Sequence, residues 1–145
     1  QSRNQVLRGH PWNFAVKRVA LAADTTAPVY EYTNAFTWPA DCLRVVEVDT
    51  TENWIIEGRK IVSNAAAPLN IVYVSEVEDP TLFDALFAET YALRLAADIA
   101  YEITASQTVL SNMETLYTTK LAEARRVDAQ EAQPATELDW LESRT

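Results

Sequence analysis

The amino-acid sequence changes its periodicity at Asp79-Pro80, and this change limits the folds that the chain can adopt. Before it, short apolar runs alternate with turn residues, as in β-strands. After it, apolar residues recur every three to four positions, as on one face of a helix. Asp79 is a favourable N-cap and Pro80 a favourable first helical residue. The sequence therefore predicts an α+β protein, with a β unit at about 14–77 and a helical hairpin at about 79–128.

The β unit is predicted to be a small antiparallel sheet or sandwich. Two apolar runs, 54–56 and 60–62, flank Glu57-Gly58-Arg59, where Gly58 can supply the positive φ of a hairpin turn. The remaining expected strands are 17–22, 29–33, 43–49 and 69–77. Short strands separated by turn residues at such spacing favour antiparallel pairing.

Two long helices are expected after Asp79. The buried face of the first is expected to comprise Phe83, Leu86, Phe87, Thr90, Leu93, Ala97, Ala100 and Tyr101. That of the second is expected to comprise Val109, Met113, Leu116, Tyr117, Leu121 and Ala124. The polar break at 104–106 is short, with Ser106 as a cap, so the helices should pack antiparallel. A shorter helix is expected at 1–7, before Gly9 and Pro11.

The charge of the chain is uneven around a net value of −9. Residues 1–23 contain cations and no acid, whereas 76–102 and 128–145 are acidic. Opposite charges on one chain suit head-to-tail contact between identical subunits, although ordinary solvated faces explain them equally well. The interface candidates among the cations are Arg3, Arg8 and Arg18. The overall sign argues against a protein that grips DNA phosphates.

The sequence offers little material for catalysis or for binding a cofactor or metal, and we predict neither. Its two Gly residues exclude a Gly-rich phosphate loop, and its single His excludes a His-rich metal centre. Cys42 lies in an apolar run and is predicted to be a buried thiol. Asp98 and Glu102 are spaced i, i+4, which is more typical of a solvent-facing helix surface than of a hydrolytic pair. The chain has no run of 18 apolar residues, so no membrane span is expected.

The four Trp residues are expected to divide into two groups. Trp12, Trp38 and Trp54 lie in or beside apolar segments and are predicted to be core residues. Trp140 lies in a tail at 132–145 that is expected to be flexible and acidic. Together with Leu138 and Leu141 it forms an apolar patch without a local partner, which predicts a docking contact.

Several segments, in this order and spacing, resemble tail tubular protein A, the head-to-tail adaptor family of short-tailed, podovirus-type phages. The segments are His10-Pro11-Trp12-Asn13-Phe14-Ala15 with Arg18-Val19-Ala20-Leu21, then Trp38-Pro39-Ala40-Asp41-Cys42-Leu43-Arg44-Val45, Trp54-Ile55-Ile56-Glu57-Gly58-Arg59 with Ile61, Ile71-Val72-Tyr73, Asp79-Pro80, Leu82-Phe83, Leu86-Phe87-Ala88-Glu89, Arg94-Leu95-Ala96-Ala97 and 124–131. The resemblance covers nearly all of 8–131 and implies one adaptor domain at 1–131. The family usually has further helix upstream, and the sequence does not begin with Met, so Gln1 is expected to follow a processing or trimming point.

The resemblance implies a structural virion protein of the tail or neck, assembled in the host cytoplasm, without catalysis. Such proteins form a ring, typically dodecameric, between the portal protein and the tail nozzle protein, and DNA passes through it without specific recognition. The free subunit is expected to be monomeric or polydisperse, because the portal would template ring closure. The alternatives are a nucleic-acid-binding module, a small hydrolase of cell wall or polysaccharide, and a generic protein-interaction domain.

Overall fold

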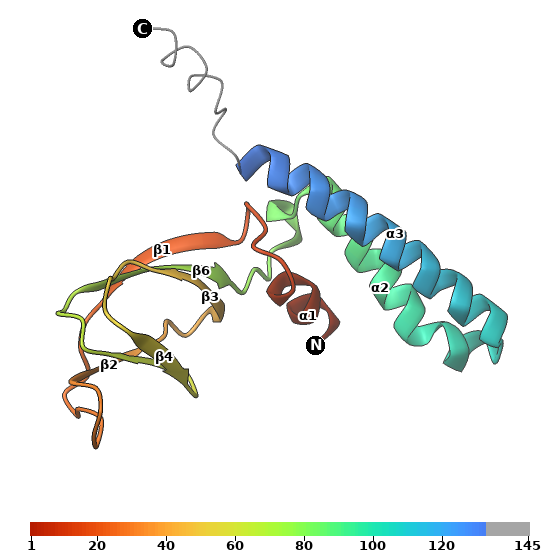
Figure 1. Ribbon diagram of the computed structural model, residues 1–145. Helices are drawn as coiled ribbons and strands as arrows, with labels where there is room; N and C mark the ends of the chain where they lie inside the picture. The colour runs from red at the N-terminus through yellow and green to blue at the C-terminus, as the bar shows by residue number, and fades with distance from the viewer. Residues whose placement is uncertain (133–145) are drawn as a thin grey trace, which may run out of the picture. The chain divides into compact units, whose positions relative to one another are not determined.

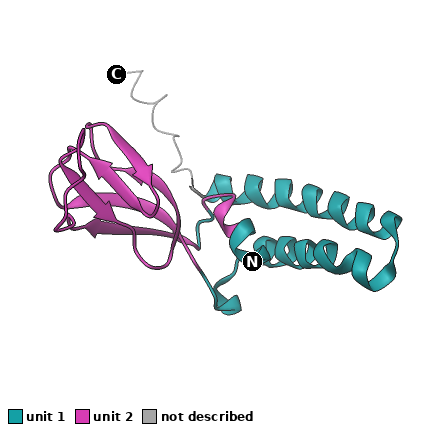
Figure 2. Ribbon diagram, turned by 90° about the horizontal axis from the view of Figure 1, so that it is seen from below, with its two compact units in different colours: residues 1–6, 12–14, 77–145 teal, residues 7–11, 15–76 magenta. Residues whose placement is uncertain are grey.

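The computed structural model describes residues 1–132 of the chain and confirms the α+β class (Figure 1). Its elements, in order, are α1 (Ser2–Arg8), β1 (Val16–Leu21), β2 (Asn34–Thr37), β3 (Cys42–Val48), β4 (Trp54–Glu57), β5 (Lys60–Ser63), β6 (Leu69–Ser75), the 3-10 helix η1 (Pro80–Leu82), α2 (Ala85–Thr104) and α3 (Gln107–Ala132). They form two compact units (Figure 2). The β unit comprises 7–11 and 15–76, and the helical unit comprises 1–6, 12–14 and the described chain from 77 to 132.

The β unit contains two antiparallel sheets of three strands each, in the orders β1-β6-β3 and β2-β5-β4. Their inner faces share one apolar core, to which both sheets contribute buried residues: Leu21, Phe36, Cys42, Val45, Ile61, Ala65, Leu69, Ile71 and Tyr73. Two sheets packed through a common core agree with the predicted sandwich. Cys42 is buried in this core, as expected.

The strand predicted at 29–33 is wrong, because this segment is an irregular loop. Val29 is 98% exposed and Glu31 has a φ of 72°, which is incompatible with a strand. The second strand begins later, at Asn34, where Ala35 and Phe36 are both buried. Apolar residue type alone therefore suggested a strand at a place where no side chain is buried.

The β4–β5 hairpin forms as predicted. A two-residue turn, Gly58-Arg59, connects the paired residues Glu57 and Lys60. Gly58 has a φ of 62°. Arg59, the second turn residue, donates to the carbonyl oxygens of Pro39 at 3.0 Å and of Cys42 at 3.2 Å. The turn is thereby tied to the start of β3.

We expect Gly58→Ala to lower the free energy of unfolding by about 1 kcal/mol, because a Cβ disfavours positive φ. No atom lies within 4 Å of the position that this Cβ would take, so the cost is one of backbone conformation and not of collision. Gly58→Asn is the matched control and should cost less, because Asn tolerates left-handed backbone better. Chemical unfolding of the three proteins measures the difference; equal stability of the Ala variant would contradict the argument.

The start of the first long helix differs from its prediction. Asp79 does cap a helix, accepting a hydrogen bond from the Thr81 N–H, but this is the single turn η1. The chain then becomes extended at Phe83, and α2 begins at Ala85 with Asp84 as its N-cap. Both Asp residues favour helix initiation, and the sequence pattern did not distinguish a single turn from a long helix.

Helices α2 and α3 form the predicted antiparallel hairpin. They are joined through Ala105, which has a φ of 52°, and Ser106, whose hydroxyl accepts from the Val109 N–H at 3.4 Å. Polar contacts between the helices include an ion pair of Lys120 with Glu89 at 3.0 Å and the Arg94 guanidinium, which lies 5.6 Å from the centre of the Tyr117 ring.

Helix α3 continues to Ala132, beyond the end at about 128 that the sequence predicts for the hairpin. Asp128 is buried, and its carboxylate accepts from the Asn13 N–H at 3.0 Å. The Asn13 side chain in turn donates to the Asp128 carbonyl oxygen at 2.9 Å. These bonds explain why an acidic, linker-like composition forms an ordered helix end here.

Aromatic rings form the core of the helical unit. Trp12 is completely buried, as predicted, and its indole N–H donates to the Val6 carbonyl oxygen at 3.0 Å. Its ring meets Phe87 edge-on, with centroids 5.1 Å apart. The rest of the cluster consists of Phe14, Phe83 and Tyr91. The segment 12–14 therefore belongs structurally to the helices, although it lies before the first strand.

Candidate interaction surfaces

The three candidate interface cations lie in different surroundings. Arg3, in the helical unit, pairs with Glu78 at 3.8 Å. Arg8, in the β unit, donates to the Leu43 carbonyl oxygen at 3.2 Å. Arg18 is exposed on β1. The structure therefore engages two of them in contacts within their own units and presents the third at a surface. The other candidates, Leu138, Trp140 and Leu141, lie outside the described residues.

Strand β4 forms an exposed apolar edge of the β2-β5-β4 sheet. Trp54, Ile55 and Ile56 are 37%, 42% and 43% exposed, so the prediction that Trp54 is a core residue is wrong. All four residues of β4 are exposed, and the apolar core of the sandwich contains no residue of this strand. The pairing of β4 with β5 is continuous, without a bulge. Proteins usually protect such an edge with charge, Pro or a bulge, so this one has the character of a contact surface.

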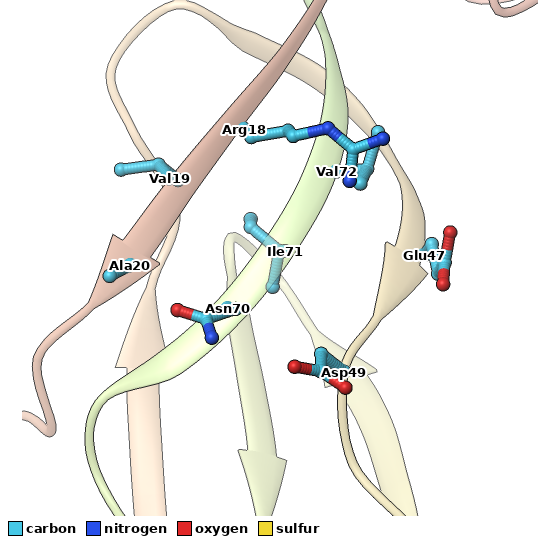
Figure 3. Close-up of a pocket in the computed structure, with 8 residues that line it drawn as sticks. All are labelled: Arg18, Val19, Ala20, Glu47, Asp49, Asn70, Ile71 and Val72. Atoms are coloured by element: carbon cyan, nitrogen blue, oxygen red, sulfur yellow. The ribbon is translucent and has the colours of Figure 1, made fainter.

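The outer face of the other sheet is hollowed by a shallow depression of about 550 Å³ (Figure 3). It is lined by Arg18, Val19, Ala20, Glu47, Asp49, Asn70, Ile71 and Val72. Arg18 reaches from β1 across β6 beside Val72, whereas Glu47 and Asp49 lie on the β3 side. The depression therefore has a cation on one rim and carboxylates on the opposite rim.

A third exposed apolar surface lies on the helical hairpin. Leu95, Ile99 and Ile103 follow one another at i, i+4 and i+8 on α2, and all three are exposed. Tyr101 and Leu116 are also exposed, which corrects the prediction that they belong to buried faces. The two helices of the hairpin cover each other on one face only. Helix α1 contacts α2 through hydrogen bonds to Arg94 and Asp98.

The carboxylates considered for hydrolysis do not form a joint site. Asp98 pairs with Arg94 at 3.2 Å and accepts a hydrogen bond from Ser2, whereas Glu102 is exposed. Within residues 1–132, no group of three or more His, Cys, Asp or Glu is placed to hold a metal ion. In the same part of the chain, every helix is too short or too polar to cross a membrane.

The ionisable groups with displaced pKa values in the β unit are explained by packing. Burial raises the pKa of the Cys42 thiol to about 11. Burial, together with a hydrogen bond to Asp41 at 3.1 Å, raises the pKa of Tyr73 to about 12. Burial would raise the pKa of Asp41, but hydrogen bonds from Lys17 and Tyr73 outweigh it, and the net shift is downward. These three groups stabilise the sandwich in their usual charge states.

We expect the stability of the β unit to fall as the pH rises from about 10 to about 12, in part through Tyr73. The folded pKa of Tyr73 is above its ordinary value, so its contribution is complete below about pH 10, where the phenol ionises in the unfolded chain, and is lost by about pH 12, where it ionises in the folded one. Tyr73→Phe should flatten this fall, and Tyr30→Phe, at an exposed Tyr, should not. Chemical unfolding at several pH values tests it; identical slopes for all three proteins would contradict it.

The sequence did not reveal the β4 edge, although one signal was present. Residues 54–56 are apolar without alternation, which fits either a strand buried on both faces or an exposed edge strand that binds another chain. Neither a scan against protein-family models nor a search of curated proteins gave a match.

Proposed function

We propose that this chain is a structural adaptor subunit that forms a ring between the portal and the tail nozzle of a short-tailed phage. The observation that carries the proposal is the exposed apolar strand β4, because such an edge is costly in an isolated protein and useful in an assembled one. The exposed Leu95, Ile99 and Ile103 on α2 provide a second surface of the same character.

The sequence resemblance supplies the kind of assembly. It connects the aromatic segment 10–15, the hairpin 54–61 and the two helices in a single pattern. In the structure, residues 12–14 pack in the core of the helical unit, and the other two parts form the β4–β5 hairpin and the helices α2 and α3. The acidic chain is compatible with a channel through which DNA slides, since a repelling wall does not retain the polyanion. A ring also turns a weak pairwise contact into a stable assembly, because each subunit is held on two sides.

Negative-stain imaging of the purified protein mixed with portal rings of its own phage tests the proposal. We expect an added ring of density on one face of the portal. Portal rings that stay bare in an excess of the protein would overturn it. A variant lacking 132–145 is expected to lose this binding, and unchanged binding would remove the docking role of Leu138, Trp140 and Leu141.

A further inference from the structure

The two sheets of the β unit have four edges, and two of these are regular and open. The β3 edge is interrupted by irregularities between Cys42 and Arg44 and between Val45 and Glu47. The β2 edge is partly used, because the Ala35 carbonyl oxygen accepts from the Asp24 N–H at 2.8 Å. By contrast, β1 pairs with β6 over six consecutive residues and β4 with β5 over four, and neither has a strand on its other side.

The registers show which backbone groups point outward from these two open edges. Bonded and non-bonded pairs alternate along an antiparallel ladder. Glu57 and Lys60 close a two-residue turn and are therefore a bonded pair, so the free N–H and C=O groups of β4 belong to Trp54 and Ile56. On the other sheet, the Ser75 N–H donates to the Ala15 carbonyl oxygen, which makes that pair a bonded one. The free groups of β1 therefore include those of Arg18 and Ala20.

We propose that β4 of one subunit adds antiparallel to β1 of a second copy of this chain. Hydrogen bonds between the free backbone groups of the two strands then place Trp54 and Ile56 opposite β1 residues whose backbone groups also point outward, such as Arg18 and Ala20. Residues that face each other across an antiparallel pair carry their side chains on the same side of the sheet. Trp54 and Ile56 therefore come to lie on the face of β1 that contains the depression, beside Ala20 at its β1 rim.

Charge selects this pairing over the association of two β4 strands. Glu52 and Glu57 flank the apolar residues of β4, so two such strands would bring like charges together. Arg18 lies on β1 and makes no ion pair within residues 1–132, whereas its neighbour Lys17 is held by Asp41 at 2.9 Å. Because β4 and β1 are different edges, each subunit can bind one neighbour through β4 and another neighbour through β1. Such contacts continue head to tail, and their closure into a ring rests on the function proposed above.

Cross-linking between two single-Cys variants tests the pairing directly. Asn53→Cys and Ala20→Cys place thiols beside β4 and on β1 and leave Trp54, Ile56, Glu57 and Arg18 unchanged. The native Cys42 is buried with a raised pKa and should not react. With a short bismaleimide in concentrated solution, we expect cross-links in the mixture of the two variants and in neither alone. Cross-links of Asn53→Cys with itself, of Ala20→Cys with itself, or none at all would overturn the proposal.

A second test changes the edge itself in this background. Ile56→Lys is expected to reduce the yield of mixed cross-links by about tenfold, since it removes one buried Ile side chain from the contact. Ile99→Lys is the matched control, a similarly exposed Ile in the helical unit, and should leave the yield unchanged. Arg18→Glu should also weaken cross-linking, because it adds a carboxylate to an edge that would face Glu52 and Glu57 of the neighbouring β4. An unchanged yield for Ile56→Lys or for Arg18→Glu, with both variants folded by circular dichroism, would overturn the proposal.

The two proposals fail separately. Mixed cross-links together with bare portal rings would leave the strand pairing standing and reject the adaptor function. A ring on the portal without mixed cross-links would support the adaptor function and reject the strand pairing.

Discussion

Replacing Phe87 by Ala is expected to lower the free energy of unfolding of the helical unit by about 3–5 kcal/mol. Phe87 is completely buried, and its ring makes edge contacts with Trp12, Phe14 and Phe83 at centroid distances of 5.1, 4.9 and 4.9 Å. Truncation removes these contacts and leaves a cavity that rigid rings fill poorly. The cluster also attaches segment 12–14 to α2, so its loss loosens two parts of the unit together.

Chemical unfolding followed by far-ultraviolet circular dichroism measures this change. Leu82→Ala is the control, because Leu82 is an apolar residue nearby that is 60% exposed, and it should change stability by less than about 0.5 kcal/mol. A loss below about 1 kcal/mol for Phe87→Ala would show that the aromatic cluster does not hold the helical unit together.

Replacing Phe36 by Ala is expected to destabilise the β unit by a similar 3–5 kcal/mol. Phe36 is completely buried on β2 and pairs with Ile61 on β5, in the core shared by the two sheets. The core is small, and one large side chain fills much of the space between the sheets. Its loss is therefore expected to be among the most damaging single changes in this unit.

Hydrogen exchange of backbone amides measures the effect in place. Faster exchange in β1, β5 and β6 is expected in Phe36→Ala. Val46→Ala, at an exposed position of β3, should leave exchange in these strands unchanged. Unaltered exchange in Phe36→Ala would mean that the sheets are held by something other than their common core.

Local signals in the sequence predicted much of the fold. Gly58 required a turn, Ser106 marked the break between the helices, and Phe87 lay on a helical apolar face; each effect acts within a few residues. The predictions that were wrong concern residues whose environment is set by parts of the chain far away in the sequence. The burial of Asp128 depends on Asn13, far away in the sequence. Trp54 is exposed together with the rest of β4, because the core does not extend to this strand, and periodicity does not specify which strands the core covers.

The candidate surfaces were harder to predict than the fold. Arg18 was identified from charge alone, but Arg8, chosen for the same reason, has its Nε–H bound to the Leu43 carbonyl oxygen. The difference between them is geometric, since it depends on which acceptor happens to lie nearby. The apolar stripe of Leu95, Ile99 and Ile103 is visible as a pattern, but whether a helix face is covered depends on elements distant in the sequence.

The bonds between Asn13 and Asp128 also order events during synthesis on the ribosome. Every strand of the β unit has emerged before α3 is translated, so the sandwich can form while the chain is still growing. The helical unit has to wait, because Asn13 precedes the first strand whereas Asp128 lies near the end of α3. A prematurely terminated polypeptide would thus display a finished sandwich beside an open aromatic cluster, a state that proteases and chaperones can discriminate from the mature subunit.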